Sequence, residues 1–304
     1  MDSSDTDVGA VHWIVLVATL LTLGPWSGSV AAAPPTRDEV VAVTRHGADG
    51  FGIYYTKLGQ AAWHFVDQGA DPALSPDGSL LAYTRVVGTG KQITRRIRVV
   101  DLRTGVGALL PEVSGGATQQ YGAVWSPDGR SLYVHVCYPE ERPMWTIGRF
   151  SYPTFEYSRV GELPPEVSQP PASSDGRFSL AVDIVPGYPG FEHDGPFGLL
   201  LVERGMPDRR TPLTPPGFLI GFSTCWLKAT NEILFTGIWK PDSDQAAWHV
   251  YRINPLERNW AAVPQSEWLQ KRVAEGQEVS CSRRTGPNQR LHPTAAAGRV
   301  SGRR

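Results

Sequence analysis

The sequence repeats one short turn in front of one kind of strand. Ser-Pro-Asp-Gly occupies residues 75–78 and again residues 126–129, and Ser-Ser-Asp-Gly occupies residues 173–176. A weaker copy, in which the turn residues are replaced, stands at residues 225–230. Each copy is followed by a segment with apolar residues at alternate positions, such as "SLLAYTR" and "RSLYVHV". Residues 38–45, "DEVVAVTR", match these segments without their turn. Alternation with a period of two predicts a β-strand after each turn.

The turn has a definite physical reading. Proline in the second position fixes a backbone angle that a type I turn requires, and aspartate bonds its own backbone in such turns. Glycine in the last position accepts a positive φ that other residues resist. Each copy therefore predicts a tight hairpin, and Asp77 and Asp128 are structural rather than catalytic in this interpretation.

Each repeat continues in the same order. A second strand follows ("GIYYTKL", "RIRVVDL", "WTIGRFSY", "GLLLVER", "WHVYRIN") and then a weaker third ("AWHFVDQ", "VGALLPE", "YSRVGELP", "RRTPLTPP", "NWAAVPQ"). A further strand leads into the next turn ("DPALS", "GAVWS", "QPPAS", "FSTCW"). Four short strands in a unit of roughly 40 to 50 residues are typical of a β-propeller blade. The predicted fold is all-β with five recognisable four-stranded blades, and only residues 264–276 have the pattern of a short helix.

Composition and cysteine content limit the function classes. The chain has 304 residues, a formal net charge of −1 and three cysteines. The chain has 29 basic and 30 acidic residues, of which three acids lie in residues 1–33 and six arginines in residues 283–304. Residues 34–282 therefore hold 23 basic and 27 acidic residues. A middle region with a net charge of −4 gives no reason to expect nucleic-acid binding. One disulfide could form, but the sequence does not place it, and the lack of Cys-x-x-C disfavours a cysteine zinc site.

The two ends differ from the repeats. Residues 1–33 contain a short apolar run (residues 11–23) ahead of small residues, as in a secretory signal peptide, with cleavage expected after Ala31. This leader has no positive charge, so a mis-assigned start codon and an uncleaved N-terminal anchor remain alternatives. Residues 283–304 hold six arginines and no acid, and we interpret them as a disordered basic tail. An anionic-surface contact is the functional alternative for this tail.

These repeats resemble those of TolB-like six-bladed propellers, which are shared with the propeller of the prolyl oligopeptidase family. The resemblance rests on "PALSPDGSLLAYT" and "AVWSPDGRSLYV" and covers residues 38–282. It implies six blades and a ring closed by joining the two chain ends in one sheet. Five blades are counted here, and a sixth begins at residues 278–286 and then runs into the tail. The ring could therefore be five-bladed, closed by a composite blade, or truncated.

No catalytic motif stands out. A prolyl-oligopeptidase-type hydrolase needs Gly-x-Ser-x-Gly, and the nearest segment, residues 221–225 ("GFSTC"), lacks the second glycine. Residues 88–94 ("GTGKQIT") lack the glycine spacing of a phosphate-binding loop and are interpreted as a loop between strands. The acidic segments at residues 192–195 and 241–244 match no complete calcium loop and are interpreted as solvated hairpins.

Histidines and tryptophans are the remaining candidates for a site. Among seven histidines, His46 and His193 fall in predicted loops and are the better candidates for a metal site at the channel. His135 falls in a strand at the repeat position of Thr84, which predicts packing between blades. Trp125 and Trp226 occupy matching repeat positions and are predicted core residues. Five other tryptophans lie on strands or near their ends, and some could line a binding face: Trp63, Trp145, Trp239, Trp248 and Trp260.

The main prediction is a non-catalytic, exported TolB-like propeller, periplasmic or secreted, that binds a protein of the cell envelope or a small ligand at one face. No cofactor, no metal and no nucleic acid are expected, and a membrane is involved only through an uncleaved leader. The alternative is a propeller-type enzyme, lyase-like and acting on glycans, with a site in the central channel. A degraded paralogue without function is a third interpretation, based on the broken sixth repeat.

Overall fold

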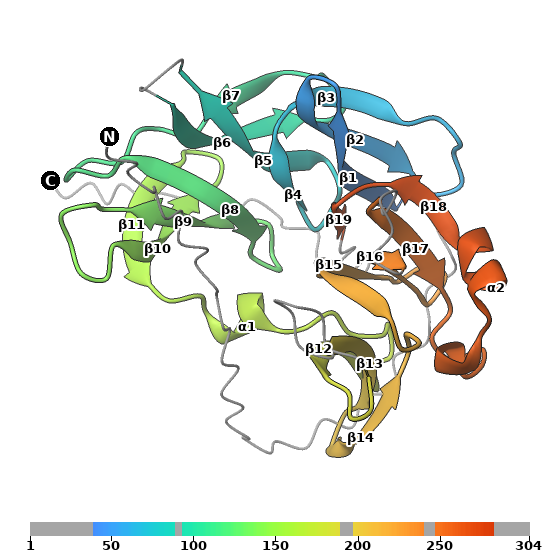
Figure 1. The fold of residues 1–304 in the computed structure, drawn as a ribbon. Helices are drawn as coiled ribbons and strands as arrows, with labels where there is room; N and C mark the ends of the chain where they lie inside the picture. The colour runs from blue at the N-terminus through green and yellow to red at the C-terminus, as the bar shows by residue number, and fades with distance from the viewer. Residues whose placement is uncertain (1–38, 89–92, 189–196, 240–246, 283–304) are drawn as a thin grey trace, which may run out of the picture. The chain divides into compact units, whose positions relative to one another are not determined.

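The computed structural model describes residues 39–88, 93–188, 197–239 and 247–282. The predicted leader and tail, His193 and the acidic segments at 192–195 and 241–244 lie outside these residues, and so do residues 89–92 of the "GTGKQIT" segment. The described part consists mainly of strands arranged in five antiparallel sheets, which are the blades of a propeller (Figure 1). Within this part, no helix is long and apolar enough to cross a membrane.

Four blades have four strands and one has three. Blade 1 contains β19 (Glu278–Cys281), β1 (Val40–Gly47), β2 (Gly50–Lys57) and β3 (His64–Gln68). Blade 2 contains β4 (Ala70–Leu74), β5 (Leu80–Val87), β6 (Thr94–Asp101) and β7 (Gly107–Leu109). Blade 3 contains β8 (Gln119–Trp125), β9 (Ser131–Cys137), β10 (Trp145–Ser151) and β11 (Glu156–Gly161).

The last two blades carry the short helices. Blade 4 contains β12 (Phe178–Ile184), β13 (Phe197–Glu203) and β14 (Met206–Pro212), and helix α1 (Pro165–Ser168) precedes it. Blade 5 contains β15 (Phe218–Leu227), β16 (Glu232–Trp239), β17 (His249–Ile253) and β18 (Arg272–Glu275). The 3-10 helix η2 (Trp260–Ala262) and helix α2 (Gln265–Gln270) lie between β17 and β18. We call β19, β4, β8 and β15, the first strands of their sheets, the inner strands.

The predicted hairpins are confirmed. In blade 2, the Ser75 hydroxyl accepts a hydrogen bond from the Leu80 amide at 2.9 Å and donates one to Asp77 at 2.6 Å. Gly78 has the positive φ of 73° that the turn demands. The same serine and aspartate contacts recur in blades 3 and 4, where the glycines have φ of 70° and 68°. Asp77 therefore serves its own turn, as the sequence predicted.

The ring is closed by a composite blade. Strand β19, from the end of the repeats, pairs antiparallel with β1, from their beginning. Ser282 takes the place that Ser75 has in blade 2, because its hydroxyl accepts a hydrogen bond from the Val40 amide at 3.0 Å. The Ser282 amide also donates to the Val40 carbonyl at 3.0 Å. Of the three predicted outcomes, the composite blade holds, and no sixth blade is present among the described residues.

The Ser282 contact yields a first prediction. Ser282→Ala is expected to lower the free energy of unfolding by about 1–3 kcal/mol, because the buried Val40 amide loses its acceptor. Ser79→Ala is a matched control, since the Ser79 hydroxyl is exposed and contacts only its own turn. Denaturant unfolding of both variants measures the effect. If the two variants are equally stable, the hydrogen bond between Ser282 and the Val40 amide does not stabilise the closed ring.

Inner strands make most contacts between neighbouring blades. The Trp125 indole donates to the Ala73 carbonyl of blade 2 at 3.1 Å. The Leu74 amide donates to the Ser280 hydroxyl of blade 1 at 3.0 Å. A disulfide between Cys225 and Cys281 joins blade 5 to blade 1, which places the one bridge that the sequence left open.

Two predicted strands are wrong. The "NWAAVPQ" segment forms η2, because the Trp260 side chain turns inward and is fully buried in the core of blade 5. The outer strand of that blade is β18 instead, so the predicted helix at 264–276 ends halfway. The "QPPAS" segment makes only a single bridge, Ala172 to Ser179, because Pro170 and Pro171 have no N–H groups to pair with β12.

Candidate functional site

The candidate site is a cavity of about 380 Å³ enclosed by the inner strands. Its walls come from blades 1, 2, 3 and 5 and from the segment that carries α1. The lining residues are Pro72, Ala73, Leu74, Pro76, Ala123, Val124, Trp125, Pro127, Glu166, Gln169, Pro170, Pro171, Ala172, Ser173, Thr224, Cys225, Trp226, Lys228, Val279, Ser280 and Cys281. Because strands far apart in the sequence supply one wall each, the cavity exists only after the ring has closed.

The walls combine apolar and polar surface in nearly equal amounts. Proline, alanine, leucine and valine side chains make up much of the surface, and Thr224 and Ser280 add hydroxyls. Glu166 on α1 and Lys228 after β15 bring one charge of each sign to the rim, and both are exposed. Such a mixture is typical of pockets that bind small organic molecules or the side chains of a partner.

Tryptophans line this cavity, but they are not the predicted ones. Trp125 and Trp226 are 5% and 4% exposed, so their prediction as core residues is confirmed, and both also lie on the cavity wall. The five tryptophans considered for a binding face are absent from the wall. Trp260 is buried in blade 5, Trp63 packs against Arg45, and Trp145 contacts Tyr121.

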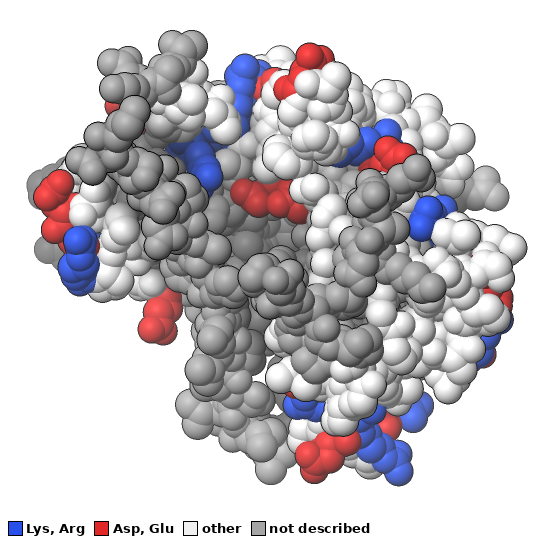
Figure 2. Space-filling view, viewed as in Figure 1, with Lys and Arg blue, Asp and Glu red and all other residues white. Residues whose placement is uncertain are grey.

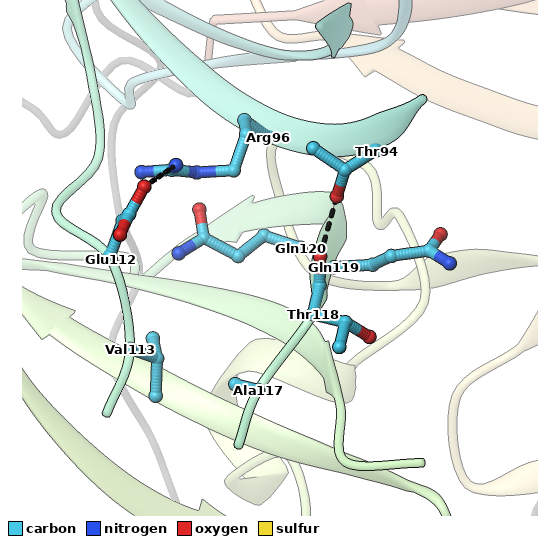
Figure 3. Close-up of a pocket in the computed structure, with 8 residues that line it drawn as sticks. All are labelled: Thr94, Arg96, Glu112, Val113, Ala117, Thr118, Gln119 and Gln120. Carbon is cyan, nitrogen blue, oxygen red and sulfur yellow. Dashed lines mark hydrogen bonds and ion pairs between the residues drawn. The ribbon is translucent and has the colours of Figure 1, made fainter. Parts of the chain in front are cut away.

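A second hollow, of about 180 Å³, lies between β6 and the segment that leads into β8 (Figure 3). Most of its polar groups are satisfied by the protein itself, although the buried Arg96 Nε has no hydrogen-bond partner. The Arg96 guanidinium binds Glu112 at 2.8 Å and the Leu110 carbonyl at 2.7 Å, and the Thr94 hydroxyl donates to the Thr118 carbonyl at 2.5 Å (Figure 3). The Gln120 amide donates to the Pro111 carbonyl at 2.9 Å. These bonds fasten one blade to the next segment, so we interpret the hollow as structural.

Two carboxyl groups meet beside the central cavity. Asp71 on β4 and Glu278 on β19 each precede a cavity-lining residue, Pro72 and Val279. One Glu278 oxygen accepts hydrogen bonds from the Asp71 amide at 2.7 Å and from the Thr44 hydroxyl at 2.5 Å. The Thr84 hydroxyl donates to Asp71 at 2.8 Å. Figure 2 shows acidic side chains at the wall of a hollow in the middle of this face, in the region of β4 and β19.

The environment of this pair alters its ionisation. Burial, followed by the neighbouring Asp71 carboxylate, raises the pKa of Glu278 to about 7. Burial lowers the pKa of His135, which is half-buried and stacked on Tyr121 with ring centroids 4.9 Å apart. Burial, followed by the charge of Asp71, raises the pKa of Tyr121. Burial and the neighbouring carboxylate thus favour the protonated form of Glu278 up to near neutral pH.

Sequence reasoning missed this pair, although a signal existed. Asp71 lies four residues before Ser75, and Glu278 lies four residues before Ser282. The two serines are structurally equivalent, so the two acids occupy one repeat position on neighbouring inner strands. Reading "EVSCS" as a displaced partner of "DPALS" would have brought them together.

The structure does not gather the histidines at the cavity. His46 is exposed at the end of β1, beside Phe51. His135 stacks on Tyr121 within its own blade, and the charge of Asp71 in the next blade acts on its pKa. Across the described ranges, no group of three or more His, Cys, Asp or Glu side chains is arranged to hold a metal ion.

Comparison with known proteins gives similarities of fold only. No family model and no curated protein matches the chain. TolB from Acinetobacter baumannii is 16% identical with a TM-score of 0.35, over 71% of this chain and 51% of that one. A putative TolB from Agrobacterium tumefaciens is 15% identical with a TM-score of 0.35, over 81% and 97%. An oligogalacturonate lyase in complex with manganese is 16% identical with a TM-score of 0.30, over 68% and 57%.

TolB proteins thus stand among the structures that this chain is similar to, as its repeats led us to expect. The chain spans about half the length of TolB from Acinetobacter baumannii. At these identities the likeness concerns the arrangement of strands and not an activity.

Proposed function

We propose that this chain is a non-catalytic binding module of the cell envelope, which holds a small ligand or a protruding side chain of a partner protein in its central cavity. The cavity carries the proposal. Its volume of about 380 Å³ lies within the range of ligand pockets. Its walls combine apolar surface with a similar amount of polar surface, including the Thr224 and Ser280 hydroxyls, and such polar groups orient a bound ligand.

Export is part of the same proposal. The Cys225–Cys281 disulfide supports it, because such bonds persist in oxidising compartments outside the cytosol. The apolar run and small residues of the leader support it independently. Cell fractionation with an antibody against the chain tests this part, and recovery in the cytosolic fraction alone would contradict it.

Binding is favoured over catalysis by the state of the two carboxyl groups. One Glu278 oxygen is held by Thr44 and by the Asp71 amide, and Thr84 holds an Asp71 oxygen. A general acid or base must reach a reacting atom, and these hydrogen bonds turn both groups toward the protein.

The alternative is a propeller-type enzyme acting on glycans, lyase-like, with its site in the channel. The observation in its favour is the pKa of Glu278, which burial and Asp71 raise to about 7, because general acid–base catalysis needs a group with a pKa near the working pH. Cleavage of acidic oligosaccharides by the purified protein, lost in Glu278→Gln, would favour this alternative over the main proposal.

A photo-cross-linking experiment tests the cavity. The photoreactive residue p-benzoylphenylalanine replaces Thr224, which is half-buried on the cavity wall, and in a control it replaces Val160, which is exposed on β11. Irradiation of cells that make the protein is expected to give a discrete adduct at position 224 and none at 160, measured by mass spectrometry. A folded Thr224 variant that gives no adduct, or equal adducts at both positions, refutes the cavity as the binding site.

A further inference from the structure

Strand β19 closes the ring and is fastened differently at its two ends. At its last residue, Cys281 is bonded covalently to Cys225 of blade 5. At its first residue, Glu278 is fastened only by the contacts of its carboxyl group and by strand pairing with Thr44 of β1. The two ends thus depend on different chemistry.

The Glu278 end links two blades through hydrogen bonds. Its carboxyl accepts from Thr44 within blade 1 and from the Asp71 amide of blade 2. The Asp71 carboxylate also lies close enough to Glu278 to favour its protonated form, and burial acts in the same direction. The Asp71 carboxylate in turn accepts a hydrogen bond from the Thr84 hydroxyl, which itself accepts one from the Gly122 amide of blade 3 at 3.1 Å. The Glu278 carboxyl group therefore belongs to a chain of hydrogen bonds that runs across three blades.

The groups that face the pair supply no direct counter-charge. Tyr121 of β8 and His135 of β9 feel the charge of Asp71, and burial favours the neutral form of both. Arg95 of β6 acts on Tyr121 and is itself exposed. Arg45 of β1, which pairs with β19, stacks its guanidinium on Tyr54 and Trp63. Strand β15, which also packs on β19, carries no acidic or basic residue, and Glu275 of β18 in blade 5 is exposed. None of the ion pairs within the described ranges involves Asp71 or Glu278.

We propose that the Asp71–Glu278 pair is a proton-operated clasp, which holds the first half of β19 against blade 2 when it carries a proton and loosens that half when the proton leaves. The disulfide keeps the second half in place, so the ring does not open completely. Because Pro72 and Val279 follow the two acids and line the cavity, loosening changes one end of the cavity wall. The clasp would act whatever the cavity binds.

The direction of the pH effect follows from linkage. In the closed state Glu278 has its pKa raised to about 7, and in the loosened state it returns toward the ordinary value of 4.5. Between these values the closed state binds one more proton, so closure is favoured at low pH and weakens as pH rises toward 7. Because opening releases one proton, the equilibrium constant for opening rises about tenfold per pH unit in this window and levels off above pH 7.

Amide hydrogen exchange between pH 5 and 8, corrected for the intrinsic pH dependence of exchange, measures this opening. The reporters are the Asp71 amide, which donates to Glu278, and the Gln277 amide, which donates to the Thr44 carbonyl. Protection of both amides is expected to fall about tenfold per pH unit up to pH 7. In Glu278→Gln, whose amide side chain imitates the protonated acid, protection is expected to stay constant over the whole range.

Glu275→Gln is the matched control, an acid-to-amide change on an exposed position, and it should keep the pH dependence of the unmodified protein.

Asp71→Asn is the second variant, usable even if Glu278→Gln does not fold, because asparagine tolerates the positive φ of 54° at position 71. It removes the charge that adds to burial in raising the Glu278 pKa, so its loss of protection should level off at a lower pH than in the unmodified protein. The proposal is overturned if Glu278→Gln and Asp71→Asn keep the pH dependence of the unmodified protein, or if the unmodified protein shows none.

Discussion

Replacing Trp268 by alanine is expected to lower the free energy of unfolding by about 3–5 kcal/mol. Trp268 lies on α2, outside the sheets, yet it is only 1% exposed. Its ring contacts Phe218 and Tyr251 with centroids 5.5 and 5.9 Å away, and Trp260 at 5.5 Å. Removing it leaves a large void in the aromatic core of blade 5, which rigid strands on both sides cannot refill. Thermal and denaturant unfolding of the purified variant measure the loss.

Two further variants separate packing from other effects. Leu269→Ala, at the next position of the same helix and 44% exposed, is expected to change stability by less than about 0.5 kcal/mol. Trp268→Phe should lose much less than the alanine variant, because it keeps most of the ring and removes an indole N–H that is buried without a partner. If the alanine variant is as stable as Leu269→Ala, α2 is not part of the core.

Loss of the disulfide is expected to lower the free energy of unfolding by about 2–4 kcal/mol. The bond joins residues 56 positions apart, so it removes many conformations from the unfolded chain. It also joins the closing strand to blade 5, and both cysteines line the cavity. The double variant Cys225→Ser/Cys281→Ser, compared with the unmodified protein by denaturant unfolding, measures this contribution.

Chemical counting of thiols gives the control. The unfolded, unreduced protein should show one free thiol, Cys137, and three after reduction. A reducing agent should lower the stability of the unmodified protein to that of the double variant and leave the double variant unchanged. Three free thiols before reduction would contradict the bridge.

Local rules were enough to predict the blades, because each hairpin depends on residues that are adjacent in the sequence. Pro76 and Gly78 set their turn through their own backbone preferences, and the alternating residues after them bury one face of a strand. The same rules failed where a tertiary contact decided the outcome. The "NWAAVPQ" segment looks like an outer strand, but burial of Trp260 against Trp268 and the aromatic rings of blade 5 makes it a 3-10 turn.

The site could be predicted only in part, for the same reason. Trp125 and Trp226 could be placed on inner strands from the repeat, but a repeat does not say that the strands enclose a cavity of about 380 Å³. His46 falls in a predicted loop, and this prediction is wrong, because His46 belongs to β1, exposed and away from the cavity wall. Asp71 and Glu278 are 207 residues apart, and only an alignment of "EVSCS" with "DPALS" as equivalent repeat positions relates them in the sequence.

The sequence by itself determined the hairpins, the blade order and the all-β class, because turn residues and apolar alternation act over a few neighbouring positions. Only the tertiary structure decided how the ring closes. The Ser282 hydroxyl accepts a hydrogen bond from the Val40 amide, 242 positions away in the sequence, just as the Ser75 hydroxyl accepts one from the Leu80 amide within one turn. Strand β19 pairs with β1, its Cys281 bonds to Cys225, and its Glu278 contacts Asp71. These long-range contacts form together when β19 docks, and they depend on shape and burial that no short stretch of sequence contains.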